Sequence, residues 1–360
     1  MKLEANTVLT IFAPGVLAGA ERVVIAGLNT FARELGHAQV ILIKEKRNPS
    51  HVENFVKMLD ASVQIEIVET SWAFDLLMPQ KLKKLIDTKF SEALIIHTHG
   101  YKALLFSSII RLPQYRVHTH HGNTSHTFKV KLYESMAQYF MRFCHGIITL
   151  SRPMYDQFKF IGAKKVAIIP NMLLMKNFNK IQSFRQQRQL GQKINLLYLG
   201  RLSKEKGVLD LLMVFKNLPN KESLDLHIVG DGPLMDKAKQ ISSDAVFHGH
   251  QNDPSQFLMN ADVLILPSHS EGMPISMMEA LSLGIIVLAN PVGAIPDYIQ
   301  SPKLLMKIGN DEIWKNGFLD LEKNFEYYRK LAIEKSDYYQ KQFSPQNWFQ
   351  RISDFYQSIV

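Results

Sequence analysis

The sequence predicts two doubly wound α/β domains in tandem, followed by a helical tail. Short apolar runs alternate with stretches of helical periodicity along most of the 360 residues. Continuous apolar strands separated by helices are typical of a parallel sheet that is covered on both faces. A chain of this length also exceeds the size at which a single core tends to divide into two.

A polar, basic and glutamine-rich stretch at residues 176–193 separates two series of strand-like apolar runs. It indicates a linker or a surface helix at a domain boundary. We therefore expect one domain over residues 1–175 and a second over residues 190–340. The expected strands are 7–12, 38–43, 62–68, 93–99, 115–121, 146–151, 165–171, 195–200, 224–230, 245–249, 262–268 and 285–290.

Helices are expected between these strands and in the tail. Over residues 20–35 the apolar side chains return at helical spacing. The last predicted helix, residues 346–358, places Trp348, Ile352 and Phe355 on one face. An apolar face of this kind is suited to packing against another part of the chain.

The composition favours an intracellular globular protein. The single cysteine, Cys144, excludes an intrachain disulfide, and we expect it to be a small buried apolar residue. No apolar run approaches the roughly 20 residues of a membrane span. The amino terminus resembles a signal peptide in its apolar stretch and in Ala18-Gly-Ala20, but Glu4 and the break at Pro14 favour a buried strand. We therefore expect a cytoplasmic protein.

The net charge of +9 is unevenly distributed. Residues 101–180 hold 12 Lys and Arg against 2 Asp and Glu. Such an excess suits an anionic membrane surface, a phosphorylated acceptor or nucleic acid, or it is simply a soluble basic surface. We expect a membrane-associated acceptor, with the protein peripheral on an anionic membrane, and no nucleic-acid partner.

The loop GRLSKEKG, residues 200–207, follows an expected strand and precedes a helix. Ligands of doubly wound sheets bind at this end of the strands. Gly200 lets the backbone turn, while Arg201 and Lys206 put two cations beside a helix N-terminus, which itself attracts anions. The loop is either a diphosphate site, with Arg forking two oxygens, or a charged and solvated connection.

Two carboxylates, Glu271 and Glu279, flank a predicted helix start. Proline is tolerated at the first helical position, so we expect Pro274 to begin the helix. Glu271 then lies in the preceding loop, where the N–H groups of Gly272 and Met273 favour an anion, and Glu279 lies about one and a half turns into the helix. This arrangement suits a sugar nucleotide, with Glu279 on the ribose hydroxyls and Glu271 on the sugar. Taken alone, it is also compatible with a solvated helix terminus.

Two glycine-containing loops are further candidates. The segment GDGP, residues 230–233, lacks both the third glycine of GxGxxG and a following GK[ST], so it is neither a dinucleotide fingerprint nor a P-loop. Gly230 is expected near a nucleotide, or it only forms a tight turn. The loop at residues 14–21 contains Gly19 and would let a ligand approach the backbone closely, unless it is a flexible surface loop.

Five histidines end two neighbouring predicted strands. Side chains at positions i and i+2 of a strand share a face, so His118 and His120 should point together and His121 away. No Asp, Glu or Cys lies nearby with metal-ligand spacing, so we expect no metal site. His121, or His120 beside it, would instead form a hydrogen bond to a phosphate or a sugar. His97 and His99 end the preceding strand.

Residues 195–297 resemble the carboxyl-terminal donor domain of family-4 glycosyltransferases, which have the GT-B fold. The family's E-x7-E pattern falls on Glu271 and Glu279. Ala18 and Met172 stand where glycines are common in the family. The matching segments are LYLGRLSKEKG, LHIVGDGP, FHG, ADVLILPSHSEGMPISMMEALSLG and ANPVGAIPD, with AGAER, HTHHG, TLS and IPN matching in the first half.

The resemblance implies two Rossmann-like domains facing across a cleft, with a final helix, residues 345–360, that crosses back to the first domain. It also implies retaining transfer of a hexose-type sugar from a UDP- or GDP-linked donor, without a metal or other cofactor. The acceptor would be a glycan or a lipid-linked molecule, as in polysaccharide or lipopolysaccharide biosynthesis. The first domain would bind this acceptor and the second the nucleotide sugar.

The predicted site residues follow from the motifs and the resemblance together. Those expected to act in catalysis are Arg201, Lys206, Glu271 and His121. Those expected to bind substrate are Glu279, Gly272, Met273, Pro274, Gly200, Gly230, Gly19 and His120. Two other functions fit the same features: a sugar-nucleotide epimerase of the same fold, or a noncatalytic protein that binds a sugar nucleotide or a polyanion. The absent GxGxxG disfavours a dehydrogenase.

Overall fold

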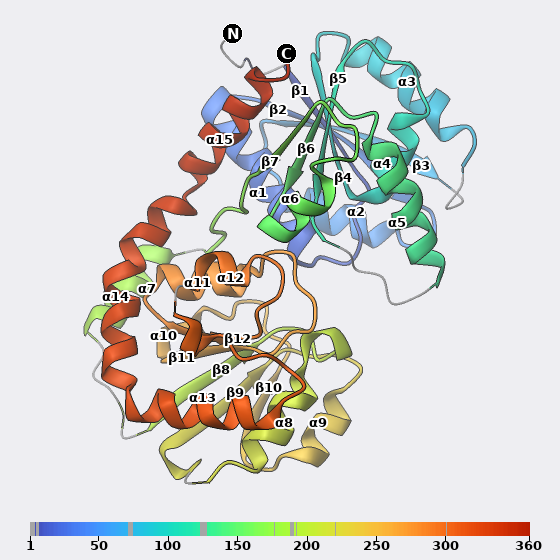
Figure 1. Ribbon diagram of the computed structural model, residues 1–360. Helices are drawn as coiled ribbons and strands as arrows, with labels where there is room; N and C mark the ends of the chain where they lie inside the picture. Colours follow the sequence, from blue (N-terminus) through green and yellow to red (C-terminus); the bar gives the residue numbers. More distant parts are fainter. Residues whose placement is uncertain are drawn as a thin grey trace. The chain divides into compact units, whose positions relative to one another are not determined.

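The computed structural model describes residues 4, 7–70, 75–122, 128–175, 177–187, 191, 193–219, 221–299 and 301–360, with the backbone alone for 128–133. The chain divides into two compact units. Unit 1 comprises Met1–Met172 and Ser344–Val360, and unit 2 comprises Leu173–Phe343. Each unit contains a fully parallel sheet with helices on both faces (Figure 1). The predicted α/β class and all twelve predicted strands are confirmed.

Unit 1 is built on a seven-stranded sheet in the order β3-β2-β1-β4-β5-β6-β7. The strands are β1 (Val8–Phe12), β2 (Ala38–Glu45), β3 (Val63–Thr70), β4 (Ile95–His99), β5 (Tyr115–His120), β6 (Gly146–Thr149) and β7 (Lys165–Ile168). The helices are α1 (Gly19–Leu35), α2 (Pro49–Val56), α3 (Met78–Lys89), α4 (Gly100–Ser108), α5 (Phe128–Met141), α6 (Arg152–Phe158) and α15 (Pro345–Gln357).

Successive side chains of the central strands of unit 1 point to opposite faces of the sheet. Leu9 and Ile11 of β1 pack with Leu82 of α3 in one apolar cluster. Thr10 points to the opposite face, where it lines a cavity together with Val24 of α1. This two-residue alternation is what a pleated strand requires, and it separates an apolar face from a face that carries polar groups.

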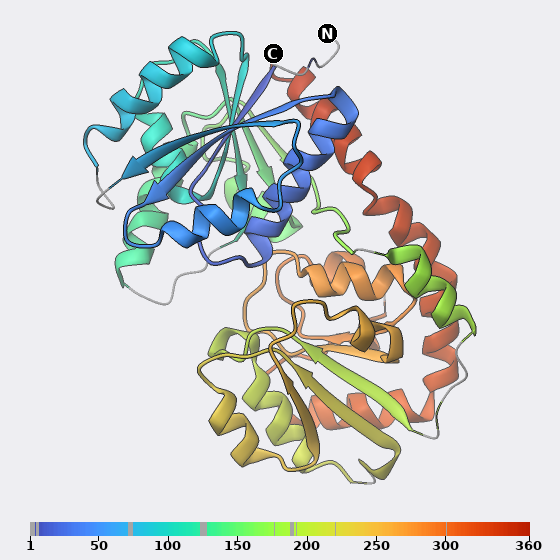
Figure 2. The same cartoon turned by 180° about the vertical axis from the view of Figure 1, so that it is seen from behind.

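Helix α15 packs against α1 within unit 1, as Figure 2 shows from behind. The indole of Trp348 lies so close to Gly27 that a Cβ atom there would be 3.1 Å from the ring. The rings of Trp348 and Phe31 meet edge to face with centroids 5.7 Å apart. Ser344 caps the helix, because its side chain accepts a hydrogen bond from the Asn347 N–H at 3.1 Å. The prediction that the final helix returns to the first domain is therefore confirmed.

Unit 2 has a five-stranded sheet in the order β10-β9-β8-β11-β12. The strands are β8 (Ile194–Leu199), β9 (Leu224–Val229), β10 (Ala245–Gly249), β11 (Val263–Leu266) and β12 (Ile286–Ala289). The helices are α7 (Phe178–Gln187), α8 (Val208–Lys216), α9 (Met235–Ile241), α10 (Ser255–Asn260), α11 (Ile275–Ser282), α12 (Ile295–Tyr298), α13 (Asp311–Lys323) and α14 (Phe325–Gln342).

The polar stretch predicted as a linker or surface helix contains α7, which belongs to unit 2. Arg185 anchors this helix by donating hydrogen bonds to backbone carbonyls of two other segments. Its Nη1 reaches the oxygens of Leu258 at 2.9 Å and Ala261 at 2.6 Å, and its Nε reaches that of Leu283 at 3.1 Å. These carbonyls lie near the carboxyl ends of α10 and α11, where helical acceptors lack intrahelical partners.

Two predictions from composition also concern the fold. Cys144 is buried in an apolar cluster with Met141 and Phe158, as predicted, and burial raises the pKa of its thiol to about 12. Among the described residues, no helix combines the length and the apolar character needed to cross a bilayer.

Candidate functional site

Polar side chains gather where the strand order of each sheet reverses. In unit 2 this occurs between β8 and β11, and in unit 1 between β1 and β4. At such switch points the loops leave in opposite directions from the carboxyl ends of neighbouring strands, which leaves a crevice for ligands. The predicted site residues divide between these two places.

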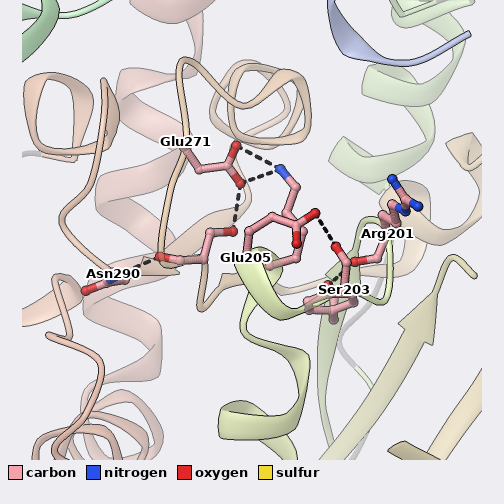
Figure 3. A network of polar contacts seen from close by, with 8 residues as sticks. Arg201, Ser203, Glu205, Glu271 and Asn290 are labelled. Atoms are coloured by element: carbon pink, nitrogen blue, oxygen red, sulfur yellow. Dashed lines mark hydrogen bonds and ion pairs between the residues drawn. The ribbon is translucent and has the colours of Figure 1, made fainter. Parts of the chain in front are cut away.

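The centre of the unit 2 site is an ion pair between Lys206 and Glu271 (Figure 3). Lys206 ends a 3-10 turn, Lys204–Lys206, that follows β8, and Glu271 lies in the loop between β11 and α11. The ammonium donates to both carboxylate oxygens, at 2.8 and 2.9 Å. The Glu271 side chain is 8% exposed and that of Lys206 is 31% exposed, so this pair is partly shielded from water. Two predicted catalytic residues, 65 positions apart, are thus in direct contact.

Two residues that the sequence analysis missed hold Glu271 in place. Ser268 donates from Oγ to a Glu271 oxygen at 2.7 Å. Asn290, directly after β12, donates to the Ser268 carbonyl at 2.8 Å and accepts from the Ile308 N–H at 3.1 Å. Both side chains are buried. The sequence could have suggested Ser268, because it lies three residues before Glu271. It could not have suggested Asn290, which follows another strand.

Arg201 lies apart from the ion pair, as Figure 3 shows. It is exposed, and within the described part of the chain its guanidinium forms no ion pair with a carboxylate. The Tyr198 hydroxyl donates to the Arg201 carbonyl at 2.8 Å and fixes the backbone of this loop. Burial, with added repulsion from Glu271 and Glu205, raises the pKa of Tyr198, so the phenol stays protonated as a donor.

The backbone around this site depends on glycine at two positions. Gly230 has φ of 140°, and a Cβ atom there would lie 1.9 Å from the carbonyl oxygen of Gly200. Gly207 has φ of 66°, and its Cβ would lie 1.8 Å from the carbonyl oxygen of Pro267. Any side chain would therefore push the loops after β8, β9 and β11 apart. The predicted residues Gly200 and Gly230 are thereby brought together.

The helix after Glu271 starts one residue later than predicted. Pro274 is the N-cap of α11, with φ of −63° and ψ of 126°, and the helix begins at Ile275. The prediction that Pro274 is the first helical residue is wrong, because its extended ψ does not fit a helix. Glu279 is half-buried on the first turns of α11, and Met273 is buried. The Gly272 carbonyl accepts from the Ala294 N–H at 2.9 Å, which ties the loop to α12.

The predicted residues of unit 1 lie on the other switch point. Gly19 is exposed at the start of α1. The loop before it is held by Glu21, whose carboxylate accepts from the N–H groups of Gly15 at 3.1 Å and Ala18 at 3.2 Å. His120 and His121 point to opposite faces, as predicted. His120 stacks edge to face on Phe158, with centroids 4.9 Å apart.

His121 lies with other histidines on the face covered by α1 and α15. Its Nε2 is 2.9 Å from Nδ1 of His99. His97 packs against His99 with ring centroids 4.2 Å apart. The Nε2 of His97 lies 2.7 Å from the Thr119 hydroxyl, and its Nδ1 lies 2.6 Å from the hydroxyl of Tyr356 on α15. The sequence analysis named the three histidines but could not connect Tyr356 to them.

These histidines are uncharged at neutral pH. Burial, together with the neighbouring imidazoles, lowers the pKa of His97 to about 3 and that of His121 to about 4. Burial also holds the pKa of His99 well below its usual value. Within the described residues, no three His, Cys, Asp or Glu side chains are grouped so that they could hold a metal ion.

Models of two protein families together match most of the chain. The model described as Glycosyltransferase Family 4 matches residues 17–173, and that described as Glycosyl transferases group 1 matches residues 179–336. The chain belongs to the family-4 glycosyltransferases. The resemblance seen in the sequence motifs is therefore confirmed.

This family-4 glycosyltransferase is similar to curated proteins over part of its length. It is 32% identical over 160 residues to a lipopolysaccharide 1,2-N-acetylglucosaminetransferase of Salmonella typhimurium, covering 39% of this chain and 42% of that protein. It is 26% identical over 154 residues to the putative teichuronic acid biosynthesis glycosyltransferase TuaC of Bacillus subtilis, covering 41% of this chain and 39% of that protein. The matches thus span about two fifths of these relatives.

A likeness in fold extends over nearly the whole family-4 chain. The crystal structure of Anabaena Alr3699/HepE in complex with UDP matches with a TM-score of 0.77. The match covers 98% of this chain and 100% of that chain, at 17% sequence identity. The GT-B fold expected from the resemblance is confirmed.

Proposed function

We propose that this protein is a retaining glycosyltransferase that moves a hexose-type sugar from a nucleoside-diphosphate donor to a glycan or lipid-linked acceptor. The observation that carries the proposal is the contact between Lys206 and Glu271 at the switch point of unit 2. In the proposal, the cation would hold the diphosphate and the carboxylate would accept hydrogen bonds from the sugar hydroxyls, at the edge where such sheets bind ligands. Family membership and the UDP complex of the similar HepE structure support the donor class.

In the proposed reaction, the bond between the sugar C1 and the β-phosphate oxygen breaks, and C1 forms a bond to the acceptor oxygen. The acceptor proton passes to a phosphate oxygen of the donor, and the nucleoside diphosphate leaves. Negative charge therefore grows on the β-phosphate in the transition state. An ammonium has three N–H donors, and Glu271 takes two from Lys206, so one remains for a phosphate oxygen. Arg201 provides a second cation on the same loop.

Substrate recognition is assigned to the neighbouring groups. Glu271 is expected to accept hydrogen bonds from the transferred sugar, and Glu279 from the ribose. The N-terminus of α11, with Gly272 and Met273 before it, favours the diphosphate. In this scheme protein cations and the helix dipole stabilise the leaving group, so transfer should need no metal. Activity that disappears with EDTA and returns with a divalent cation would contradict this part.

The proposed acceptor is a glycan or a lipid-linked molecule. The names of the two relatives connect them to lipopolysaccharide and teichuronic acid, which favours a glycan or lipid-linked acceptor here. The basic excess in residues 101–180 suits an anionic membrane surface that would present it. We expect the protein to sediment with vesicles that contain anionic lipid at low salt but not with neutral vesicles. Equal recovery with both kinds would contradict peripheral membrane binding.

The deciding experiment incubates the protein with UDP- and GDP-linked sugars and measures the release of UDP or GDP, with and without a glycan acceptor. A transferase releases the nucleotide diphosphate and forms a glycoside, and NMR of its anomeric proton should show the configuration of the donor. An epimerase would instead yield an epimer without an acceptor. A noncatalytic binding protein would show only a thermal shift with the donor. A product of inverted configuration would contradict retention.

A further inference from the structure

The buried histidines of unit 1 take part in two hydrogen-bonded groups, one that begins on α15 and one that ends at His121. Their described contacts join Tyr356 to His97, His97 to Thr119, and His99 to His121. His97, His99, Thr119 and Tyr356 are all buried. A neutral imidazole has one N–H donor and one bare acceptor nitrogen, so the proton position on each ring is set by its partners.

Tyr356 determines which nitrogen of His97 carries the proton. Its hydroxyl is fully buried, and among the described residues its hydrogen-bond partner is Nδ1 of His97. A buried hydroxyl that donates to nothing is costly, so the phenol must donate to this nitrogen. Because neutral His97 then has a bare Nδ1, its proton is on Nε2 and is donated to the Thr119 oxygen.

A cavity connects Thr119 to His99. It has a volume of about 20 Å³, and Tyr356 does not line it. Most of its lining is apolar, and its polar side chains are Thr10, His97, His99, Thr119, His121 and Asn171. A cavity of more than about 10–15 Å³ that offers two to four polar partners can hold a water molecule, and these side chains provide such partners. A water there can accept the Thr119 proton and donate to Nε2 of His99. His99 then carries its own proton on Nδ1, where it faces His121.

We propose that His99 is a positioning residue for His121: it donates from Nδ1 to Nε2 of His121 and so fixes the His121 proton on Nδ1. His121 therefore offers its substrate an N–H donor, which suits a sugar or phosphate oxygen that accepts a hydrogen bond. It does not act as a general base through Nδ1. The identity of the substrate in this inference rests on the proposed function. The tautomers are a property of the protein itself and do not depend on that function.

The low pKa values of this cluster agree with the assignment, because they keep the rings neutral and allow one tautomer to persist. His118 and His120, the two histidines of β5, lie on the opposite face, where His118 contacts the Thr98 hydroxyl at 3.0 Å and His120 contacts Phe158. They are therefore not part of the hydrogen-bonded network that ends at His121.

The first test reads the tautomers directly by NMR of ring ¹⁵N nuclei in the protein without substrate. We expect His121 and His99 to be protonated on Nδ1 and His97 on Nε2. Tyr356→Phe should remove the preference at His97. The control is Tyr115→Phe. The Tyr115 hydroxyl donates to the carbonyl of Val360, the last residue, at 3.1 Å, and Tyr115 contacts none of these three histidines. A wild-type His121 with its proton on Nε2 would overturn the proposal.

The second test compares His99→Asn with His99→Asp. The two side chains have the same shape, but the amide can donate a proton near the position of Nδ1, whereas the carboxylate can only accept. We expect His99→Asn to keep kcat within about threefold, while His99→Asp moves the His121 proton to Nε2 and lowers kcat about 100-fold, with little change in the donor KM. Equal activities of the two variants, with both folded by thermal scan, would contradict the proposal. If the tautomers are as expected but no sugar donor is turned over, the proposed function fails and the positioning role stands.

Discussion

The switch points of the two sheets carry groups of opposite character. In unit 2, an ion pair between Lys206 and Glu271 occupies the edge after β8 and β11. In unit 1, uncharged imidazoles and hydroxyls occupy the edge after β4 and β5. The first arrangement can stabilise charge that develops on a leaving group, while the second can only direct hydrogen bonds. Sheets of the same kind thus carry polar groups of different character, and the side chains at the ends of a few strands decide which.

The supporting residues differ in the same way. Glu271 is held by Ser268 and, through it, by Asn290, so its support comes from the loops of its own sheet. In unit 1, His97 is hydrogen-bonded to Tyr356, which belongs to the last helix of the chain. The unit 2 site should therefore respond mainly to local changes, and the unit 1 site to anything that loosens α15.

The largest expected effect is the loss of the cation in unit 2. Lys206→Ala should lower turnover of the proposed reaction about 10³-fold, equivalent to about 4 kcal/mol, because the developing phosphate charge loses its nearest partner. Lys204→Ala, an exposed lysine of the same turn, is the matched control and should stay near wild type. Initial rates and thermal scans of both variants check this. Near-wild-type turnover of Lys206→Ala would show that the ion pair of unit 2 does not stabilise the leaving group, and this difference between the two switch points would be lost.

The next effect concerns the backbone of the charged site. Gly230→Ala should lower the free energy of unfolding of unit 2 by about 3 kcal/mol or more, because the new methyl group would collide with the Gly200 carbonyl. Gly249→Ala is the control, since Gly249 also has positive φ, at 67°, but nothing lies within 4 Å of the new Cβ. It should cost about 1–2 kcal/mol. Urea unfolding of both variants separates the cost of the atomic collision from the cost of the strained backbone. Equal losses of unfolding free energy would show that backbone strain alone causes the destabilisation.

Acid should destabilise unit 1 before unit 2. The folded pKa values of His97, about 3, and His121, about 4, lie below the ordinary value of 6.5, so between these values the unfolded chain binds protons that the folded chain does not. Their contribution to stability is present above pH 6.5 and is lost as the pH falls, by up to about 1.4 kcal/mol per pH unit for each histidine. Hydrogen exchange of β4 and β5 against β8 and β11, at pH 7 and 4.5, measures this. His97→Gln should reduce the difference, and parallel loss in both sheets would contradict it.

The smallest expected effect tests the support of Glu271. Ser268→Ala removes one hydrogen bond to the carboxylate and should lower kcat/KM about tenfold, or about 1.4 kcal/mol. Ser270→Ala changes an exposed serine directly before Glu271 and serves as the control. Steady-state kinetics with the donor varied would show the difference. If both variants behave alike, Glu271 does not depend on Ser268.

Much of the local structure could be predicted because it depends on neighbours in the chain. The strands around Leu9 and Leu264 were visible as short apolar runs. The helix face of Trp348 and Ile352 followed from helical spacing. The start of α11 was misplaced by one residue, because a proline fits both the N-cap and the first helical position and its ψ angle is not encoded locally.

The sequence by itself determined the two α/β domains, the glycines at tight turns and the polar residues of the loops that follow the strands. These depend on apolar periodicity and on backbone geometry, which act over a few residues. Only the tertiary structure decided which side chains meet. Lys206 reaches Glu271 because crossover connections set β8 beside β11, and His97 reaches Tyr356 across 259 positions because α15 packs on α1. Such contacts arise from the order of strands and the packing of helices, and no local pattern in the chain specifies either one.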